Sequence, residues 1–224
     1  MSEKTLEKFF SQFPTVKFKA GDIFIRPGNK CVSLYVVTEG TVKIYSIDSN
    51  NVERRILSAQ KYELIPSGWL VNPKIPAQYY YAGFTDVVCA VVSIEELNSK
   101  LKKEPDVLYE LLKIQDHRVQ FAKFRIESLI QSKAAYKLLH FFHYLSLRVS
   151  EPANSEGISK LKVALTQQEI GDALGITRET VAKTIAILEK QGLIIPHGYK
   201  SFDINVKKLL IELQKYPLHQ ELGV

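Results

Sequence analysis

Residues 165–194 constrain the fold more than any other part of this 224-residue chain. Thr166 and Glu169 have the spacing of a capping box, so the sequence predicts a short helix that begins at Gln167. Gly175 is expected to end this helix, because glycine readily adopts the left-handed backbone that a sharp turn requires. A second helix that follows such a turn would complete a helix-turn-helix.

That second helix is expected to begin after Thr177, a good N-cap residue, and to end near Gly192. Gly171 would let the two helices approach closely, and Val181 would supply a buried β-branched side chain at their crossing. A helical hairpin with a solvated, charged face is the simpler alternative. The capping box, the glycine placement and the strands expected after Gly192 together favour the helix-turn-helix.

The first half of the second helix presents side chains of the kind that read base edges. Arg178 can donate two hydrogen bonds to guanine O6 and N7, and Glu179 can accept one from cytosine N4. Lys183, one turn later, can reach a base or a phosphate. Because an acidic residue would weaken a surface that only attracted phosphate, the pattern indicates sequence-specific binding in the major groove.

A β-hairpin is expected directly after this helix. Residues 193–195 read as one strand, His197 and Gly198 as a turn, and residues 202–204 as the returning strand. Such a hairpin would form the wing of a winged helix-turn-helix and would place His197 and Lys200 near the DNA backbone.

The first hundred residues read as short strands separated by turns. Residues 42–47 alternate apolar and polar side chains with a period of two, and further strand candidates occupy residues 34–37, 79–84 and 87–92. Strands at this spacing predict a β jelly roll, or double-stranded β-helix.

A long helix is expected between these two regions, over residues 105–130. Its side chains repeat in steps of three and four, as in the seam of a coiled coil, so we expect a homodimer joined through this helix. A helix that simply packs on its own domain is the alternative. The stripe consists of Leu108, Leu111/Leu112, Gln115, Val119, Ala122, Ile126 and Leu129.

The predicted fold class is therefore α+β, in three parts. Residues 1–102 form the jelly roll, residues 103–131 the central dimerisation helix, and residues 132–224 the winged helix-turn-helix. Ser132 is expected to cap the first helix of the last part, over residues 133–149.

Composition permits this interpretation but does not establish it. Thirty Lys plus Arg against 24 Asp plus Glu give a net charge of +6, which suits a polyanionic partner. The longest apolar run, residues 87–92, is far shorter than the roughly 20 residues of a membrane-spanning helix. Two cysteines and an N-terminus without the apolar core of a secretion signal suit the cytoplasm.

With these parts in this order, the whole chain resembles the CRP/FNR family of bacterial transcription regulators. The resemblance is closest over residues 166–197 and includes the turns Gly21-Asp22, Pro27-Gly28 and Glu39-Gly40. It implies a homodimer on a palindromic operator of double-stranded DNA, with half-sites about 34 Å apart. It also implies RNA polymerase as a partner, through surfaces that include the loop at residues 150–160.

The resemblance further assigns the DNA contacts. It makes Arg178 the principal guanine reader, Glu179 the second base reader and Lys183 the third, where relatives often have arginine. Gln167 stands where relatives often have a basic residue. The residues expected at the DNA are Thr166, Gln167, Gln168, Thr177, Arg178, Glu179, Thr180, Lys183, His197 and Lys200.

Members of this family that bind cyclic AMP hold its phosphate with a Gly-Glu pair followed by an Arg-Ser pair. Residues 63–70 contain no Gly-Glu pair, and Ala77 and Gln78 align with the Arg-Ser pair. Ala122 and Lys123 align with the hydroxyl pair that meets the adenine. A buried phosphate without these donors would remain uncompensated. We therefore expect no cofactor, and DNA binding that is either constitutive or controlled by an unidentified effector.

Aromatic side chains cluster where the nucleotide would lie. Trp69, Tyr79 and Tyr81, with Ala122 and Lys123, form a candidate pocket for an uncharged or aromatic effector. The simpler alternative is that these rings only fill the barrel and its surface. Gating by a cyclic nucleotide or another small molecule remains the alternative for the function.

Other sensing chemistries have less support. Two cysteines cannot supply the four ligands of an iron–sulfur cluster, although Cys31, after Lys30, is a candidate thiol switch. His140 and His143 lack an evident third metal ligand. A cupin-type enzyme shares the jelly roll, but residues 1–100 contain no His, so we expect no enzyme. An architectural protein that bends DNA without sequence preference is the last alternative.

Overall fold

The computed structural model describes residues 2–198 and 200–215. It divides into two compact units, residues 1–120 and 121–224, which are described separately. The boundary falls inside the long helix α3 (Pro105–Ile130), so each unit contains part of that helix.

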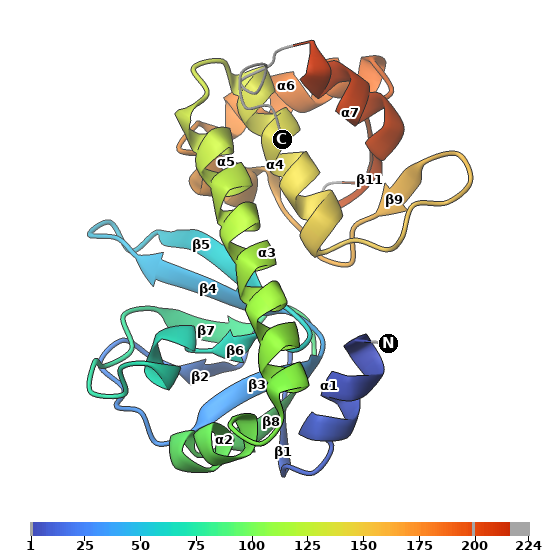
Figure 1. The fold of residues 1–224 in the computed structure, drawn as a ribbon. Helices are drawn as coiled ribbons and strands as arrows, with labels where there is room; N and C mark the ends of the chain where they lie inside the picture. Colours follow the sequence, from blue (N-terminus) through green and yellow to red (C-terminus); the bar gives the residue numbers. More distant parts are fainter. Residues whose placement is uncertain (1, 199, 216–224) are drawn as a thin grey trace. The chain divides into compact units, whose positions relative to one another are not determined.

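The 1–120 unit contains the predicted jelly roll, made of two four-stranded antiparallel sheets (Figure 1). Strands neighbour one another in the order β1-β8-β3-β6 in one sheet and β2-β7-β4-β5 in the other. The strands are β1 (Thr15–Phe18), β2 (Ile23–Ile25), β3 (Leu34–Glu39), β4 (Val42–Ile47), β5 (Glu53–Ala59), β6 (Leu64–Ile65), β7 (Tyr80–Gly83) and β8 (Val87–Val92).

The core of this unit consists of the inward side chains of the strands and of one helix that the sequence analysis missed. Val36 of β3 and Val42 of β4 are fully buried, as the period-two pattern predicts. Helix α1 (Ser2–Phe10) adds Leu6, Phe9 and Phe10 to the same core. The three- and four-residue spacing of these side chains is the amphipathic pattern of a helix, so the signal for α1 was present in the sequence.

Two helices, α2 (Ile94–Leu101) and α3, follow the strands, and α3 begins where the sequence predicts. The Ser93 hydroxyl caps α2 by accepting a hydrogen bond from the Glu96 backbone N–H, and α3 begins at Pro105. One face of α3 packs on the jelly-roll core through Val107 and Leu111. Another face leaves apolar side chains exposed, and these are Leu108, Leu112, Val119, Ile126 and Leu129.

The 121–224 unit packs helices around a small antiparallel sheet of order β10-β11-β9. Phe142 and Phe202 meet edge to face in its core, with ring centroids 5.6 Å apart. The elements of this unit beyond α3 are α4 (Ala134–Arg148), β9 (Ile158–Lys160), α5 (Gln167–Leu174), α6 (Arg178–Lys190), β10 (Ile194–His197), β11 (Ser201–Asn205) and α7 (Val206–Gln214).

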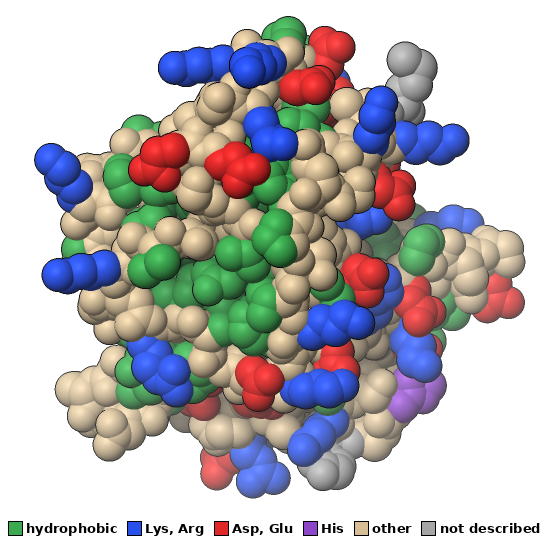
Figure 2. Space-filling view, turned by 90° about the horizontal axis from the view of Figure 1, so that it is seen from below, with side chains coloured by type: hydrophobic (Ala, Val, Ile, Leu, Met, Phe, Trp, Pro, Cys, Tyr) green, Lys and Arg blue, Asp and Glu red, His purple; other side chains and the backbone are tan. Residues whose placement is uncertain are grey.

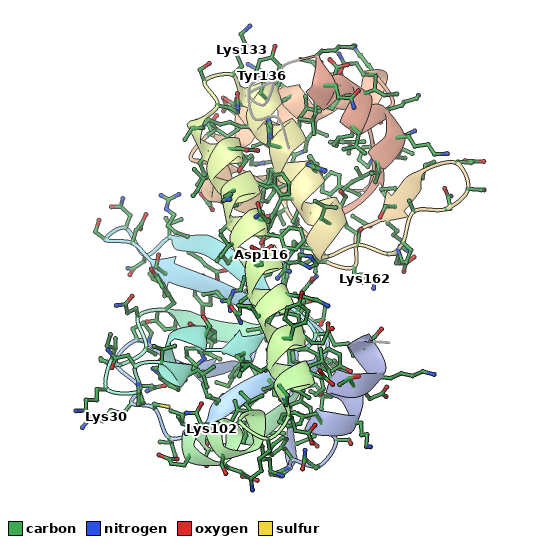
Figure 3. All side chains as sticks on the ribbon, viewed as in Figure 1. Lys30, Lys102, Asp116, Lys133, Tyr136 and Lys162 are labelled. Carbon is green, nitrogen blue, oxygen red and sulfur yellow. The ribbon has the colours of Figure 1, made fainter. Side chains whose placement is uncertain are left out.

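Two expectations about this unit need correction. The N-cap of α4 is Lys133 rather than Ser132, and its side chain makes no capping hydrogen bond. Instead, the Lys133 ammonium lies 5.5 Å from the centroid of the Tyr136 ring, one turn into the helix (Figure 3). The loop at residues 150–160 also contains strand β9, which pairs with β11.

The face shown in Figure 2 carries charges of both signs. Lysine, arginine and acidic side chains are interspersed there around a central apolar patch. Within the described residues, no helix has the length and apolar character needed to cross a membrane.

Candidate functional site

Helix α5 begins with the predicted capping box. The Thr166 hydroxyl oxygen accepts a hydrogen bond from the Glu169 backbone N–H at 3.1 Å, and a Glu169 carboxylate oxygen accepts one from the Thr166 backbone N–H at 2.7 Å. The side chains of Thr166 and Glu169 thereby satisfy two backbone N–H groups at the N-terminus of α5.

The turn between α5 and α6 depends on two glycines. Gly175 follows α5 with a φ of 66°, in the left-handed region that other residues adopt only with strain. A Cβ atom at Gly171 would lie 2.7 Å from the Ile176 carbonyl oxygen, so a side chain there would push the turn away from α5. Val181 of α6 is fully buried, as predicted for the crossing of the two helices.

Two cations hold the last carbonyls of α5, and the sequence analysis missed both. The buried guanidinium of Arg125, on α3, donates to the Ala173 carbonyl oxygen and to the Ser128 hydroxyl. The Lys137 ammonium, on α4, donates to the Leu174 carbonyl oxygen at 3.3 Å. Cations at a helix C-terminus are favoured by the helix dipole. This pair therefore fixes α5 against the C-terminal half of α3 and against α4.

Helix α6 presents the predicted base-reading side chains. Its N-cap, Thr177, accepts a hydrogen bond from the Thr180 backbone N–H at 3.1 Å, and the two hydroxyls lie 2.9 Å apart. Arg178, Glu179 and Lys183 are exposed, and none of them makes a hydrogen bond or ion pair with another described residue. Their polar groups are therefore available to a partner outside the chain.

Several of the remaining residues expected at the DNA form hydrogen bonds or an ion pair within the protein. Besides Thr166 in the capping box, the Gln168 amide donates to Asp172 at 2.9 Å, while Gln167 is half-buried. In the β10–β11 hairpin, His197 Nε2 lies 2.9 Å from an Asp203 carboxylate oxygen. Lys200 is exposed at the end of the same hairpin.

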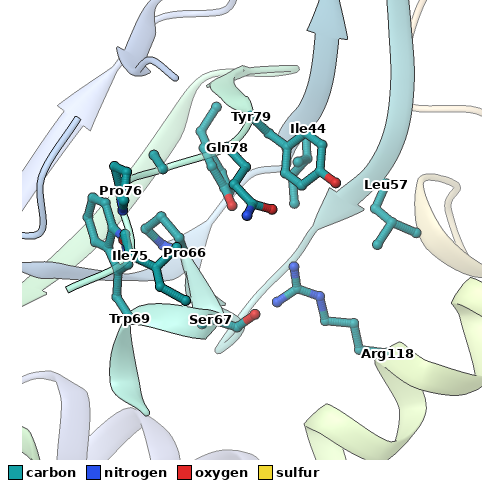
Figure 4. Close-up of a pocket in the computed structure, with 13 residues that line it drawn as sticks. Ile44, Leu57, Pro66, Ser67, Trp69, Ile75, Pro76, Gln78, Tyr79 and Arg118 are labelled. Carbon is teal, nitrogen blue, oxygen red and sulfur yellow. The ribbon is translucent and has the colours of Figure 1, made fainter. Parts of the chain in front are cut away.

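A second candidate site is a cavity of about 290 Å³ in the 1–120 unit (Figure 4). It contains the predicted Trp69, Tyr79 and Tyr81, whereas Ala122 and Lys123 belong to the other unit and do not line it. The lining residues are Ile44, Leu57, Pro66, Ser67, Gly68, Trp69, Ile75, Pro76, Ala77, Gln78, Tyr79, Tyr81 and Arg118.

Arg118 is the lining residue that the sequence analysis missed. It stands on α3, one helical turn before Ala122, and so shares that helix with the two residues that the alignment indicated. One terminal nitrogen, Nη1, donates to the Leu64 carbonyl oxygen at 3.2 Å, and Nε lies 3.6 Å from a carboxylate oxygen of the buried Glu63. Burial raises the pKa of Tyr81, and the charge of Arg118 acts in the opposite direction.

The cysteines and histidines show little sign of redox or metal chemistry. Burial raises the pKa of Cys89 to about 12. Burial and the nearby carboxylate of Glu95 also raise the pKa of Cys31, which disfavours the reactive thiolate of a redox switch. Burial and the neighbouring His140 lower the pKa of His143. Among the described residues, no three His, Cys, Asp or Glu side chains are grouped as metal ligands.

Comparison with known protein families matches both units. The model for Crp-like helix-turn-helix domains matches residues 135–213, and the model for cyclic nucleotide-binding domains matches residues 15–104.

Individual relatives extend over most of the chain. The anaerobic regulatory protein of Pasteurella multocida is 30% identical over 199 residues, which cover 88% of this chain and 68% of the relative. The cAMP-activated global transcriptional regulator CRP of Salmonella typhimurium is 23% identical over 197 residues, which cover 88% of this chain and 92% of the relative. A solved transcriptional regulator of the CRP/FNR family from Thermus thermophilus has a TM-score of 0.68 at 25% identity and covers 90% of this chain and 98% of its own.

Proposed function

Because the chain belongs to the CRP/FNR family of transcription regulators, we propose that it binds a palindromic operator as a homodimer, with one α6 helix in each major groove. Like its relatives, it is a DNA-binding regulator and not an enzyme. The observation that supports the proposed reading mode best is the exposed trio of Arg178, Glu179 and Lys183, which has no hydrogen-bonding partner among the described residues.

The chemistry of this trio suits direct recognition of bases. The planar guanidinium of Arg178 can bond O6 and N7 of one guanine, and the Glu179 carboxylate can accept from a cytosine amino group. A carboxylate in this position repels phosphate, so it favours only those sequences that offer it a donor. Specificity is then the expected property, rather than general affinity for DNA.

Substitution of Arg178 tests this assignment. We expect Arg178→Ala to weaken binding to the preferred operator by about 1–3 kcal/mol per half-site and to relax the preference at one base position. Lys190→Ala is the matched control, because Lys190 is an exposed cation at the opposite end of α6. Titration of fluorescent duplexes at fixed salt measures both variants. Equal losses for the two variants would mean that only charge matters and would contradict base reading.

The proposed dimer rests on the exposed apolar stripe of α3. Leu112, Val119 and Ile126 are each more than half exposed, and they recur every seven residues. The helix packs on its own chain through another face, so this one is left for a partner helix, as in a coiled coil. Two subunits joined in this way can place two reading helices on one palindrome.

A charge placed in the stripe tests the dimer. We expect Val119→Glu to shift the protein from dimer to monomer, because two carboxylates would face each other in the seam. His117→Glu introduces the same charge at an exposed position of α3 outside the stripe and should leave the dimer intact. Analytical ultracentrifugation distinguishes these results, and a wild-type monomer at micromolar concentration would contradict the proposal.

The lining of the cavity supports the proposal that a cyclic nucleotide is not the effector. The Ala77 backbone N–H, at the position aligned with the family's arginine, donates to the Asn29 carbonyl oxygen at 2.8 Å. The cation that lines the cavity is Arg118, and the carboxylate of Glu63 already lies beside it. We propose that DNA binding is independent of cyclic AMP. We also propose that the protein acts in the cytoplasm and that the loop at residues 150–160, which is exposed over residues 151–156, contacts RNA polymerase.

A further inference from the structure

One face of the small sheet in the 121–224 unit carries a carboxylate beside an imidazole. Strand β11 alternates, because Phe202 and Ile204 are buried in the core while Asp203 lies on the opposite face. On β10, His197 pairs with Ser201, which makes Asp203 its diagonal neighbour on that face. The Nε2 atom of His197 lies 2.9 Å from a carboxylate oxygen of Asp203. The two residues therefore form a hydrogen-bonded pair in the β10–β11 hairpin, here called the wing.

Among the described residues, the side chain of Asp203 makes a hydrogen bond or an ion pair with His197 alone. Lys160 lies opposite Asp203 on β9, but no ion pair joins these two residues. The second carboxylate oxygen, Oδ1, is buried and has no hydrogen-bond partner in the described part of the chain. The Asp203 side chain is 20% exposed, against 53% for that of His197. A mostly buried carboxylate with one partner holds that partner in place, because its loss would leave the charge uncompensated.

The hydrogen bond to Asp203 decides which nitrogen of His197 carries a proton. An ionised carboxylate only accepts hydrogen bonds, so Nε2 must be the N–H of this pair. In the neutral imidazole, Nδ1 is then a bare acceptor, whereas in the imidazolium it is a second donor. Nδ1 has no hydrogen-bond partner among the residues that the structure describes, and more than half of the side chain is exposed. Nδ1 can therefore donate to a group outside the protein only after the imidazole is protonated.

The end of the wing that carries His197 is attached to the helix-turn-helix. The Leu165 backbone N–H donates to the Lys200 carbonyl oxygen at 2.8 Å, and Thr166, the N-cap of α5, follows directly. The exposed Lys200 side chain accompanies His197 at this end of the hairpin. A DNA phosphate only accepts hydrogen bonds. A bare Nδ1 offers it nothing, whereas the N–H of an imidazolium offers it a charge-assisted hydrogen bond.

We propose that Asp203 is a positioning residue that makes DNA binding sensitive to pH, because His197 binds a DNA phosphate through Nδ1 only when its imidazole is protonated. This inference rests on the proposed function for the placement of the wing beside DNA. Histidine is the side chain whose charge changes between pH 5 and 8, so the affinity for DNA follows pH within this range. The reading residues Arg178, Glu179 and Lys183 include no histidine, so the preferred sequence stays the same while the affinity changes.

Salt titrations at pH 6 and pH 8 test this proposal. The full-length protein is titrated with a fluorescent duplex that carries the palindrome selected by wild type, and with a duplex of unrelated sequence. Each phosphate contact contributes about 0.9 to the slope of log affinity against log salt, so two wings should steepen this slope by about 2 at pH 6. At about 0.1 M salt, the affinity should be at least about fivefold higher at pH 6 than at pH 8. Because a phosphate contact reads no sequence, both duplexes should show the steepening.

Two variants connect the pH difference to the pair. His197→Gln has no imidazole and should give the same slope at both pH values. Asp203→Asn replaces the carboxylate by an amide, which can donate to Nε2, so a neutral imidazole can carry its proton on Nδ1 and bind phosphate at pH 8. At least about half of the pH difference should then disappear. Lys160→Gln, which removes an exposed cation of the neighbouring strand, is the control and should keep the pH difference, and circular dichroism verifies that each variant is folded.

Three results would overturn the proposal. They are equal slopes of wild type at both pH values, the wild-type pH difference in folded His197→Gln, and an undiminished pH difference in folded Asp203→Asn. The last result would leave Asp203 with a structural role alone. Failure of the proposed function gives a different pattern, since wild type would then bind the palindrome and the unrelated duplex equally at each pH. The pH difference is measured on both duplexes, so it is tested whichever result that comparison gives.

Discussion

The helix-turn-helix and the cavity of the jelly roll are specified by the sequence in different ways. In α5 and α6, the cap, the turn glycine and the reading side chains lie within thirty residues, and each has a local physical reason. The cavity instead draws Ile44, Trp69, Tyr79 and Arg118 from separate elements, and the shape of the pocket depends on how these elements pack. Local chemistry therefore predicts the first site, whereas the second also requires tertiary structure.

This difference should be visible in how the two regions respond to equivalent substitutions. The helix-turn-helix depends on close contacts between neighbouring segments, so one added atom at a contact should reduce the free energy of unfolding. A residue that borders the open space of the cavity, such as Gly68, should tolerate a small change better.

The largest contrast is expected between two glycines. Gly171→Ala would place its Cβ 2.7 Å from the Ile176 carbonyl oxygen, whereas a Cβ at Gly68, in the cavity wall, meets no atom within 4 Å. We expect Gly171→Ala to destabilise the 121–224 unit by about 1–3 kcal/mol, as overpacking does, and to weaken operator binding. Thermal unfolding and duplex titration measure the two effects.

Gly68→Ala is the matched variant and should leave both unfolding and operator binding close to wild type. If it were as destabilising as Gly171→Ala, the contrast between a locally fixed motif and a tolerant cavity would be wrong.

A smaller contrast is expected between two helix caps. Thr166→Ala removes the hydroxyl of the capping box of α5, and Ser93→Ala removes the cap of α2. Each should reduce the free energy of unfolding by about 0.5–2 kcal/mol. We expect only Thr166→Ala to weaken operator binding as well, because α5 supports the reading helix. Equal operator affinity of the two variants would indicate that α5 does not position α6.

The smallest contrast is expected in how low pH affects the stability of the two units. Partial burial lowers the pKa of His143, so below about pH 6.5 the unfolded chain binds more protons than the folded chain. Stability therefore decreases as the pH is lowered, until the pH reaches the lowered pKa of the folded protein. In the 1–120 unit, the pKa values of Asp48 and Asp86 are lowered by their hydrogen bonds, so these groups stay ionised over the same range.

Urea unfolding at pH 7 and at pH 5.5 tests this contrast. Wild type should lose more stability over this interval than His143→Gln, which has no imidazole to protonate. Identical losses would show that His143 does not contribute to the pH dependence.

The parts of the fold that sequence analysis could predict are those with local rules. The capping box, the turn at Gly175 and the strand of residues 42–47 each follow from residue type and spacing, and each is confirmed. Helix α1 escaped because its apolar residues stand at the edge of a segment that reads as strands. Strand β9 escaped because a three-residue strand in a polar loop has too little pattern and forms only by pairing with β11.

The cavity shows the limit of the same reasoning. Its aromatic members were found through alignment with the family, but Arg118 was not, because nothing in the sequence around it distinguishes an arginine that faces a pocket from one in solvent. The same holds for Arg125 and Lys137, whose partners at the end of α5 lie 48 and 37 residues away.

Selection of bound sequences from a pool of random duplexes tests the central claim most directly. The purified full-length protein is used, with Arg178→Ala protein selected in parallel. We predict that wild type enriches a palindrome with a guanine in each half-site and half-sites about 34 Å apart, and that the variant loses the guanine preference. Retention of duplexes without a symmetric sequence, or the same sequence from both proteins, would contradict the assignment of α6 as the reading helix.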